Sequence, residues 1–321
     1  MKKLAFVLLL LLAVIASYLF LPTSLPRSPL SFTLEAGSLR HAARQMKKEG
    51  VLSSTLPFIL LARVMGKASL IKAGNYELDH ALTPLQLLAK ITGNDFTQSK
   101  ITLVEGTTFK EIRKLLDQDP DLRHDSGKMA DQGILTKLGA RNASPEGLFF
   151  PDTYYFAKGQ SDLSVLRRSY AMMQSRLEKA WAGRAQGLPL SDPYQALTLA
   201  SIVEKETGRA GERAMVAAVF LNRLKIGMKL QTDPTVIYGL GSRFDGNLRK
   251  KDLVTDQPYN TYTRAGLPPT PIAMPGLKSI DAVLHPAHSR ALYFVAKGDG
   301  TSYFSTSLAE HNRAVDRYQK K

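Results

Sequence analysis

Residues 190–208 read LSDPYQALTLASIVEKETG, and this stretch decides how the C-terminal half of the chain folds. Asp192 followed by Pro193 is a favourable pair at a helix start, and Gly208 is a natural helix end. The stretch therefore predicts a helix of about four turns whose last turn carries Glu204 and Glu206.

The two glutamates point to different sides of this predicted helix. Because each residue advances the helix by about 100°, they project about 160° apart and cannot act as a pair. Glu206 continues the apolar stripe of Leu199, Ile202 and Val203, so we expect it to be the less solvated carboxylate. Burial raises the pKa of a carboxyl group, as a general acid near neutral pH requires. The alternative is an inert glutamate exposed at a frayed helix end.

Three polar segments follow the glutamate helix. A helix over 212–225 ends near an asparagine, residues 230–241 (LQTDPTVIYGLG) are predicted to form a turn, and residues 258–276 contain a rigid proline-rich loop. Amide and tyrosine side chains suit sugar hydroxyls and N-acetyl groups, so we expect them to bind glycan. The alternative is that the tyrosines and prolines pack a coil-rich flank of the fold. The candidate residues are Asn222, Gln231, Asp233, Tyr238, Asn260 and Tyr262.

An aromatic stretch, PEGLFFPDTYYF, occupies residues 145–156. Its proline and glycine residues interrupt regular structure. Aromatic rings stack on sugar faces, so the stretch is either part of a carbohydrate site or a cover over the core. Glu146 and Asp152 are its polar members that could reach a ligand.

Residues 31–140 alternate short strand and helix patterns. A strand over 31–35, a Ser-capped helix over 38–50, a more buried helix over 55–66 and a Thr-capped helix ending at Gly93 are predicted. Such units resemble the LysM type of glycan-binding module. A plain spacer domain is the alternative.

The N-terminus carries Lys2 and Lys3, followed by 18 uncharged positions, residues 4–21. This length nearly matches the ~20 residues that span a bilayer. A cleaved signal peptide is the alternative, because VIA before Ser17 offers a weak cleavage site. An uncleaved anchor is favoured because the apolar run continues past that site. The lysines then place the N-terminus in the cytoplasm and the rest of the chain beyond the cytoplasmic membrane.

The composition limits the classes of partner. The net charge of +15 suits anionic partners, such as phospholipid headgroups or an acidic polymer. No zinc-finger spacing, RRM signature or dense basic run with aromatics favours nucleic acid. The chain has no cysteine. His285 and His288 have poor spacing for a metal pair, so we expect no metal. No Walker loop or G-x-G-x-x-G motif indicates a nucleotide cofactor, and we expect no cofactor.

Four long motifs resemble those of one known family: ASIVEKETG, FLNRLKIGMKLQTDPTVIYGLG, YNTYTRAGLPPTPIAMPG and LYFVAKGDGTSYFSTSLAEHN. They are similar to the YceG-like (MltG) endolytic murein transglycosylases, and the resemblance covers nearly the whole chain. It implies an α+β fold with these parts: a cytoplasmic tip (1–3), a transmembrane anchor (4–22), a proline-rich stalk (23–30), a membrane-proximal region with a LysM-like module (31–140) and a catalytic domain (141–321).

The resemblance also implies a reaction. Such enzymes cut between N-acetylmuramic acid and N-acetylglucosamine of peptidoglycan without water, leaving a 1,6-anhydro end. They typically use one glutamate followed by Ser or Thr, which fits Glu206 and not Glu204. It implies substrate contacts at Gln231, Asn260 and Tyr262, and contact with peptidoglycan synthases. Glu146 and Glu204 remain candidates for binding the substrate.

Two rival functions stay open at this point. A muramidase-type hydrolase would use Asp233 as a second carboxylate to activate water, and it would release reducing ends. A non-catalytic wall-binding anchor would use the LysM-like region and leave Glu206 inert.

Overall fold

The computed structural model describes residues 6, 9, 10, 13, 16–23, 25, 26, 28–35, 37–93, 99–142 and 144–319. No helix within these ranges is both long enough and apolar enough to cross a bilayer. The predicted anchor, residues 4–22, lies partly outside the described residues, and the predicted tip, residues 1–3, lies wholly outside them. Both stay predictions.

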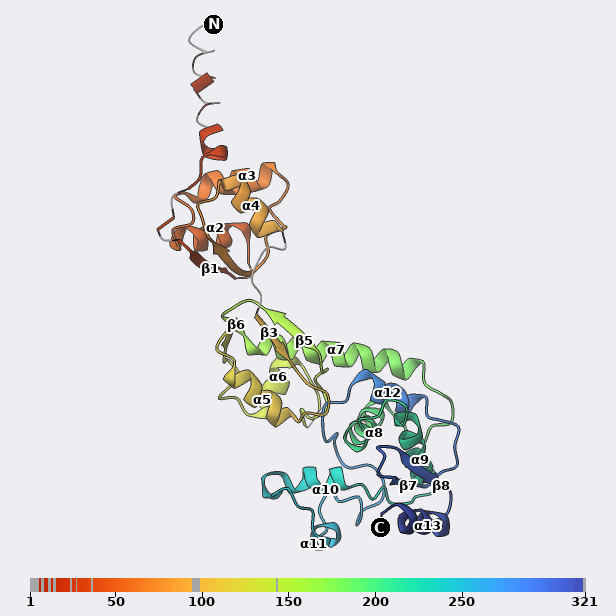
Figure 1. Cartoon of the computed structure of the whole chain (residues 1–321). Helices are drawn as coiled ribbons and strands as arrows, with labels where there is room; N and C mark the ends of the chain where they lie inside the picture. The colour runs from red at the N-terminus through yellow and green to blue at the C-terminus, as the bar shows by residue number, and fades with distance from the viewer. Residues whose placement is uncertain are drawn as a thin grey trace. The chain divides into compact units, whose positions relative to one another are not determined.

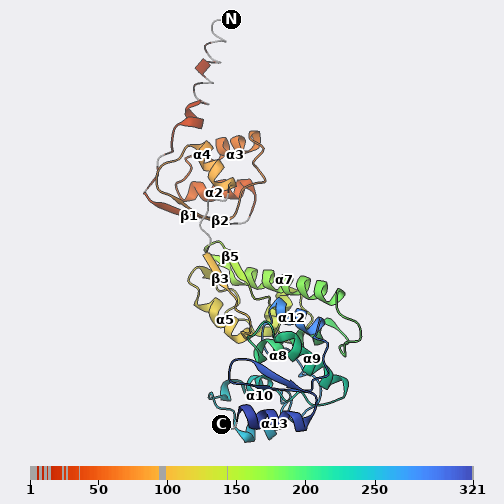
Figure 2. The same ribbon diagram turned by 45° about the vertical axis from the view of Figure 1, so that its right-hand side comes forward.

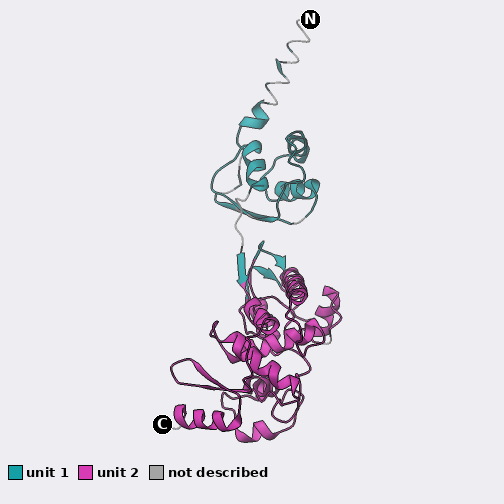
Figure 3. Cartoon of the chain, turned by 90° about the vertical axis from the view of Figure 1, so that its right-hand side faces the viewer, with its two compact units in different colours: residues 1–101, 119–123, 155–161 teal, residues 102–118, 124–154, 162–321 magenta. Residues whose placement is uncertain are grey.

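The chain divides into two compact units (Figure 3). Unit 1 comprises residues 1–101, 119–123 and 155–161; unit 2 comprises residues 102–118, 124–154 and 162–321. This division corrects the predicted boundary at residue 140, because most of 102–140 belongs to unit 2. Buried aromatic packing is the reason: the Phe109 ring stacks on that of Phe149, with centroids 5.0 Å apart.

Within unit 1, residues 30–93 form a two-stranded antiparallel sheet and three helices (Figure 1). The elements of this part are β1 (Leu30–Leu34), α2 (Leu39–Lys48), α3 (Thr55–Val64), β2 (Gly74–Leu78) and α4 (Pro84–Thr92). The predicted caps are confirmed: Ser38 accepts the His41 amide hydrogen, and Thr83 forms a capping box with Gln86. Local polar chemistry therefore defines where these helices begin.

Two expectations about unit 1 need correction. The segment predicted to be a stalk is bonded to unit 1: the Thr23 amide donates to the Leu82 carbonyl over 3.0 Å, and the Ser28 hydroxyl donates to the Asp79 carbonyl. Helix α3 was predicted to be more buried than its neighbour, yet only one of its faces enters the core. The apolar residues on its other face lie in solvent.

Unit 2 is built around α8 (Pro193–Glu206), which contacts four other helices. These are α7 (Asp162–Ala182), α9 (Arg213–Lys225), α10 (Asp233–Leu240) and α12 (Leu277–Leu284), and Figure 1 shows α8, α9 and α12 grouped together. Asp192 caps α8 by accepting the Gln195 amide hydrogen, as the Asp-Pro pair predicted. The helix ends at Glu206, two residues before the predicted stop at Gly208.

The remaining elements surround this helical centre or are short. They are β3 (Ser99–Thr102), α5 (Phe109–Gln118), β4 (Leu122–Arg123), α6 (Asp131–Leu138), β5 (Thr153–Phe156), β6 (Gln160–Ser161), the 3-10 helix η1 (Gly241–Arg243), α11 (Lys250–Val254), β7 (Tyr293–Ala296), β8 (Ser302–Ser305) and α13 (Leu308–Tyr318). Strand β3 pairs with β5, and β4 pairs with β6. The predicted hairpin is confirmed, because β7 and β8 pair antiparallel. The fold is therefore mixed α+β.

One prediction for unit 2 is wrong. Residues 230–241 were expected to be a turn, but most of this segment forms helix α10. Pro234 lies in the first turn of α10, where its missing amide hydrogen costs nothing. The segment is thus helical from Asp233 onward.

Candidate active site

The last turn of α8 carries both glutamates, and both lie mostly below the surface. Every residue from 196 to 203 is buried, so α8 has no single apolar stripe. The side chain of Glu204 is only 7% exposed. The expectation that Glu206 is the less solvated carboxylate, drawn from a stripe, therefore has no basis in this helix. The two carboxylates differ in their partners.

Both carboxylate oxygens of Glu204 have a partner within the protein. Its Oε1 lies 3.5 Å from Nη2 of Arg213, a side chain that is 10% exposed, and its Oε2 accepts the amide hydrogen of Gly276 over 2.9 Å. Gly276 is the N-cap of α12, where unpaired amides favour a negative charge. Glu204 thus joins α8, α9 and α12. This corrects its prediction as a substrate-binding residue.

Glu206 has a different set of neighbours. Its Oε2 accepts a hydrogen bond from the Thr232 hydroxyl over 2.7 Å. Burial raises the pKa of Glu206, and the negative charge of Asp233 raises it further. The Thr232 hydrogen bond and the Arg223 cation lower this pKa, but burial has the larger effect. The surroundings of Glu206 therefore raise its pKa above that of an ordinary glutamate.

The segment before α10 is held beside Glu206 by threonines. The Gln231 amide donates to the Thr261 carbonyl, and the Thr232 amide donates to the Thr261 hydroxyl, each over 3.1 Å. The hydroxyls of Thr235 and Thr261 are 2.8 Å apart. Gln231 has a φ of 49°, a left-handed conformation that costs free energy in a residue with a Cβ. The bonds to Thr261 hold this strained residue, with an exposed side chain, next to the acid.

The YNTY segment contributes one side chain that faces the site and one that supports it. The Tyr262 hydroxyl donates to Oδ1 of Asp233 over 2.6 Å, and burial and Asp233 both raise the pKa of Tyr262. Asn260 is 0% exposed, and its Nδ2 donates to the carbonyls of Asp252, Leu253 and Thr255. The prediction that Asn260 contacts substrate is corrected: it braces the loop that carries Tyr262.

Glu146 and Tyr238 form a second buried cluster. Glu146 is 4% exposed; its Oε1 accepts the Phe109 amide hydrogen over 2.9 Å, and its Oε2 accepts the Tyr238 hydroxyl hydrogen over 3.0 Å. Burial, the largest cause, raises the pKa of Glu146 to about 7. The Tyr238 ring packs edge-on against Tyr259, with centroids 4.9 Å apart. Both predicted ligand-binding side chains thus use their polar groups inside unit 2, and the aromatic stretch covers core.

Asn222 also supports a loop. Its Nδ2 donates to the carbonyls of Ser289 and Ala291 over 2.9 and 3.0 Å. This contact secures the chain before β7 and uses both amide hydrogens of Asn222. Asn222 is half-buried, and the idea that it also binds glycan stays a prediction.

Three residues near Glu206 escaped the sequence analysis: Thr232, Thr261 and Arg223. Arg223 is buried, and its guanidinium donates to the carbonyls of Leu230 and Leu292 over 2.6 and 2.7 Å. The repeated threonines in QTDPT and NTYT were the available signal, because a buried threonine needs a hydrogen-bond partner. Their partners lie far away in sequence, so spacing alone does not identify them.

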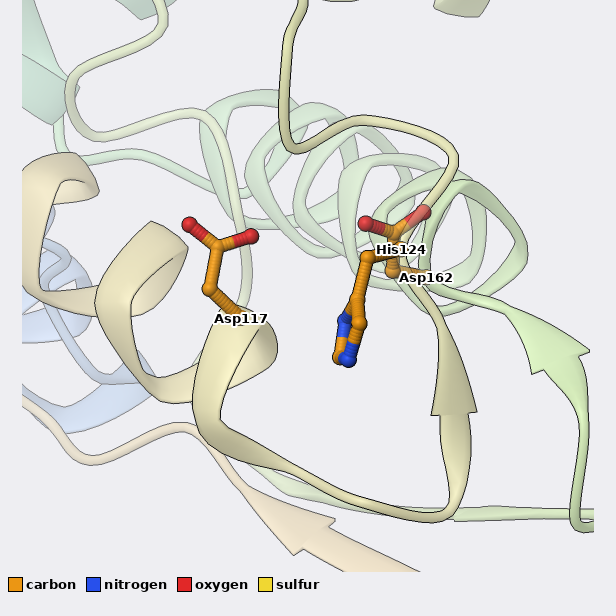
Figure 4. Close-up of side chains that lie close together, drawn as sticks. All are labelled: Asp117, His124 and Asp162. Atoms are coloured by element: carbon orange, nitrogen blue, oxygen red, sulfur yellow. The ribbon is translucent and has the colours of Figure 1, made fainter.

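Asp117, His124 and Asp162 come close enough to suggest a metal site (Figure 4), with one ligand atom of each within 4.8 Å of the others. The Asp162 carboxylate, however, is occupied: its oxygens accept hydrogen bonds from the Ser126 amide, the Ser126 hydroxyl and the Leu163 amide. A carboxylate has about four lone-pair positions, and these bonds use them. Asp162 therefore binds backbone and hydroxyl groups at the start of α7, and its oxygens are not available to a cation.

Comparisons with known proteins show which family the chain resembles. The model of the YceG-like family matches residues 32–317. A Bacillus subtilis (strain 168) protein named endolytic murein transglycosylase is 31% identical over 310 residues, which is 91% of this chain and 85% of the relative. A protein of the same name from Streptococcus pneumoniae is 26% identical over 315 residues; the match covers 88% of this chain and only 56% of that relative.

A solved structure is also similar. The crystal structure of a YceG-like protein from Listeria monocytogenes matches with a TM-score of 0.55 and 30% sequence identity, covering 89% of this chain and 98% of that chain. The family model spans most of the chain, and the Bacillus relative extends over nearly all of it. This chain belongs to the YceG-like family.

Proposed function

We propose that this chain is an endolytic lytic transglycosylase that cuts peptidoglycan between N-acetylmuramic acid and N-acetylglucosamine. The product would carry a 1,6-anhydro-N-acetylmuramic acid end, and cutting nascent strands would terminate their elongation. The names of the Bacillus and Streptococcus relatives support the reaction class. The observation that carries the proposal is Glu206: a half-buried carboxyl group with a raised pKa, hydrogen-bonded by Thr232 beside exposed Gln231 and Asp233.

In the proposed mechanism, the two oxygens of Glu206 have different tasks. Oε2 receives the Thr232 hydroxyl hydrogen, so the acidic proton belongs on Oε1. Glu206 donates this proton to the glycosidic oxygen as the bond from that oxygen to C1 of N-acetylmuramic acid breaks. Proton donation by a positioned side chain contributes about 10²–10⁴-fold to a rate.

The same residue then acts as the base. Ionised Glu206 removes the proton from the 6-hydroxyl of the muramic residue, whose oxygen bonds to C1 and closes the anhydro ring. The acid is regenerated, and no water enters. The N-acetyl oxygen of the substrate stabilises positive charge at C1 in place of a second carboxylate, as in substrate-assisted glycosidases. The residues of this site supply the proton transfer without a metal or cofactor.

Three side chains are proposed to contact the sugar at this acid. Gln231 and Asp233 flank Thr232 and are exposed, and Tyr262 fixes the Asp233 carboxylate through its hydroxyl. An amide, a carboxylate and a phenol provide donors and acceptors for sugar hydroxyls and N-acetyl groups. The strained backbone of Gln231 fits a functional position, because such strain persists where the surrounding structure enforces it.

We also propose a location and partners for the chain. Residues 4–22 would form a single membrane anchor with the N-terminus in the cytoplasm and unit 2 outside the cytoplasmic membrane. Within unit 1, residues 30–93 would form a LysM-like module that binds glycan; their paired strands and three helices support this. Peptidoglycan synthases are proposed partners because nascent glycan is made at that membrane.

Mass spectrometry of the cleaved ends tests the proposed reaction. The full chain in detergent would be incubated with purified peptidoglycan beside its Glu206→Gln variant. We expect internal ends one water lighter than hydrolysis products, and none from the variant. Reducing ends would instead support a hydrolase that uses Asp233, and glycan binding without cleavage would support a non-catalytic anchor.

A further inference from the structure

Helix α3 presents an apolar face to solvent. Leu56, Leu60 and Val64 are 74%, 63% and 78% exposed, and their spacing of four residues puts them on one face. The opposite face is buried through Phe58 and Ala62. The outward face of a surface helix is ordinarily polar, so this helix departs from the usual pattern.

Two further exposed apolar residues follow the helix in sequence. Met65 and Leu70, in the turn that follows α3, are also exposed. We call Leu56, Leu60, Val64, Met65 and Leu70 together the α3 surface. Contiguous exposed apolar residues of this kind mark a protein or membrane contact rather than ordinary scatter.

The charges in the stretch of sequence that contains the α3 surface have one sign. Between Glu49 and Glu77 the sequence contains three cations, Arg63, Lys67 and Lys72, and no carboxylate. Apolar side chains accompanied by Lys and Arg are typical of helices that lie in the interface of a bilayer containing anionic lipid. A protein partner would offer no general reason for the absence of acidic residues over this span.

Unit 1 is joined closely to the apolar N-terminal run. Leu19, within that run, packs against the unit 1 core, and the amide of Thr23 is bonded to Leu82. Figures 1 and 2 both place α3 on the side of unit 1 from which residues 16–20 emerge, and the β1–β2 sheet on the other side. Phe20 and Leu21, at the end of the run, are themselves exposed. An inserted run would therefore bring the α3 surface to the lipid.

We infer that the α3 surface lies in the interfacial layer of an anionic bilayer and docks unit 1 on the membrane. This inference rests on the proposed membrane anchor. Docking adds a second membrane contact to the anchor and fixes the face that unit 1 turns to the lipid. Five apolar side chains leave water, while the cations remain at the headgroups.

Single-cysteine labelling tests the inference, because the chain has no cysteine of its own. One full chain would carry Leu60→Cys, and the matched control would carry Glu77→Cys at an exposed position of β2. Both would be labelled with an environment-sensitive fluorophore. They would be reconstituted into vesicles of equal parts phosphatidylethanolamine and phosphatidylglycerol. We expect a blue shift and quenching by brominated lipid at position 60, and neither at position 77. A Leu56→Glu change in the position 60 protein should lower the equilibrium constant for docking by roughly tenfold or more.

Flotation of the same vesicles separates failure of the anchor from failure of docking. Chains that do not float would overturn both the anchor and the inference. Chains that float with an unshifted label at position 60 would overturn docking alone. A blue shift without quenching by brominated lipid would place a second protein on the α3 surface and also overturn the inference.

Discussion

The last turn of α8 carries two carboxylates, Glu204 and Glu206, which are shielded from water in different ways. On one side, Glu204 is paired with Arg213 and the amide of Gly276. On the other side, Glu206 is bonded to the neutral hydroxyl of Thr232, and burial outweighs the effect of the Arg223 cation. Burial alone therefore does not distinguish a catalytic acid. The distinguishing feature is the set of partners, and the surroundings of Glu206 have the net effect of raising its pKa.

The strongest way to break this comparison is to neutralise each glutamate in turn. Glu206→Gln keeps the side-chain shape but removes the transferable proton, so we expect strand cleavage to fall about 10²–10⁴-fold. The matched control, Glu204→Gln, loses an ion pair outside the reaction and should stay within about tenfold of the parent, as expected for a residue that acts on structure. The assay is the initial rate of fragment release by the full chain. Equal losses in both variants would contradict the comparison.

Breaking the Glu204–Arg213 ion pair should instead lower the free energy of unfolding. Arg213→Ala leaves a buried carboxylate without its cation, and breaking such a pair costs about 3–5 kcal/mol. Urea unfolding followed by the single tryptophan, Trp181 of α7, reports on unit 2. Lys225→Ala, an exposed cation on the same helix as Arg213, is the control and should stay within about 0.5 kcal/mol. A loss no larger than that of the control would show that the pair contributes nothing.

Glu146 sharpens the comparison, because it is also buried and has a raised pKa, but its oxygens are bonded to Phe109 and Tyr238. Its pKa is raised from 4.5 to about 7, so the folded state holds the proton more tightly than the unfolded state does. Stability from this group is complete below pH 4.5 and is lost as the pH rises through about 7, a loss of at most about 3 kcal/mol. We expect Glu146→Gln to flatten this part of the stability profile. Parallel parent and variant profiles would refute the assignment.

Replacing Thr232 tests whether its hydrogen bond sets the pKa of Glu206. Its hydrogen bond favours the ionised carboxylate, so Thr232→Val should raise the pKa of Glu206 further. Because the acid must be protonated to react, kcat/KM should fall as the pH rises through the Glu206 pKa. In the variant, this basic limb should move to higher pH. A limb that stays in place while the rate drops would indicate that Thr232 only positions the carboxyl group.

Gln231 should give the smallest effect on stability. Glycine tolerates a φ of 49° without strain, so Gln231→Gly should leave unfolding unchanged or stabilise unit 2 by up to about 1 kcal/mol. If the amide binds sugar, KM should rise nevertheless. The Gln231→Ala variant separates the two roles, since it removes the amide and keeps the strain. An unchanged KM in both would remove Gln231 from the proposed site.

Local chemistry made much of this fold predictable. The Asp192-Pro193 pair and Thr83 start helices as expected, because a cap needs only its own next few residues. The hairpin of β7 and β8 followed similarly from its glycine-rich turn. Helix α10 was missed because its proline and glycines were read as turn residues.

The site was only partly predictable, for a different reason. The raised pKa of Glu206 was anticipated, although the stripe argument behind it does not hold for a helix buried all round. Asn260 and Glu146 were read as sugar ligands because their side chains are polar. Their actual partners are backbone groups and a tyrosine that the folded chain brings together. Sequence shows which residues can bind a ligand, but long-range packing decides which of them remain unpaired.

The central claim is that Glu206 returns the proton from the sugar's own hydroxyl and activates no water. Cleavage of peptidoglycan by the full chain in water enriched in oxygen-18 tests this most directly, with product ends read by mass spectrometry. The account predicts unlabelled ends, each one water lighter than a hydrolysis product, and no new ends from Glu206→Gln. Ends that carry oxygen-18 would contradict it and would make Asp233 the residue that activates water.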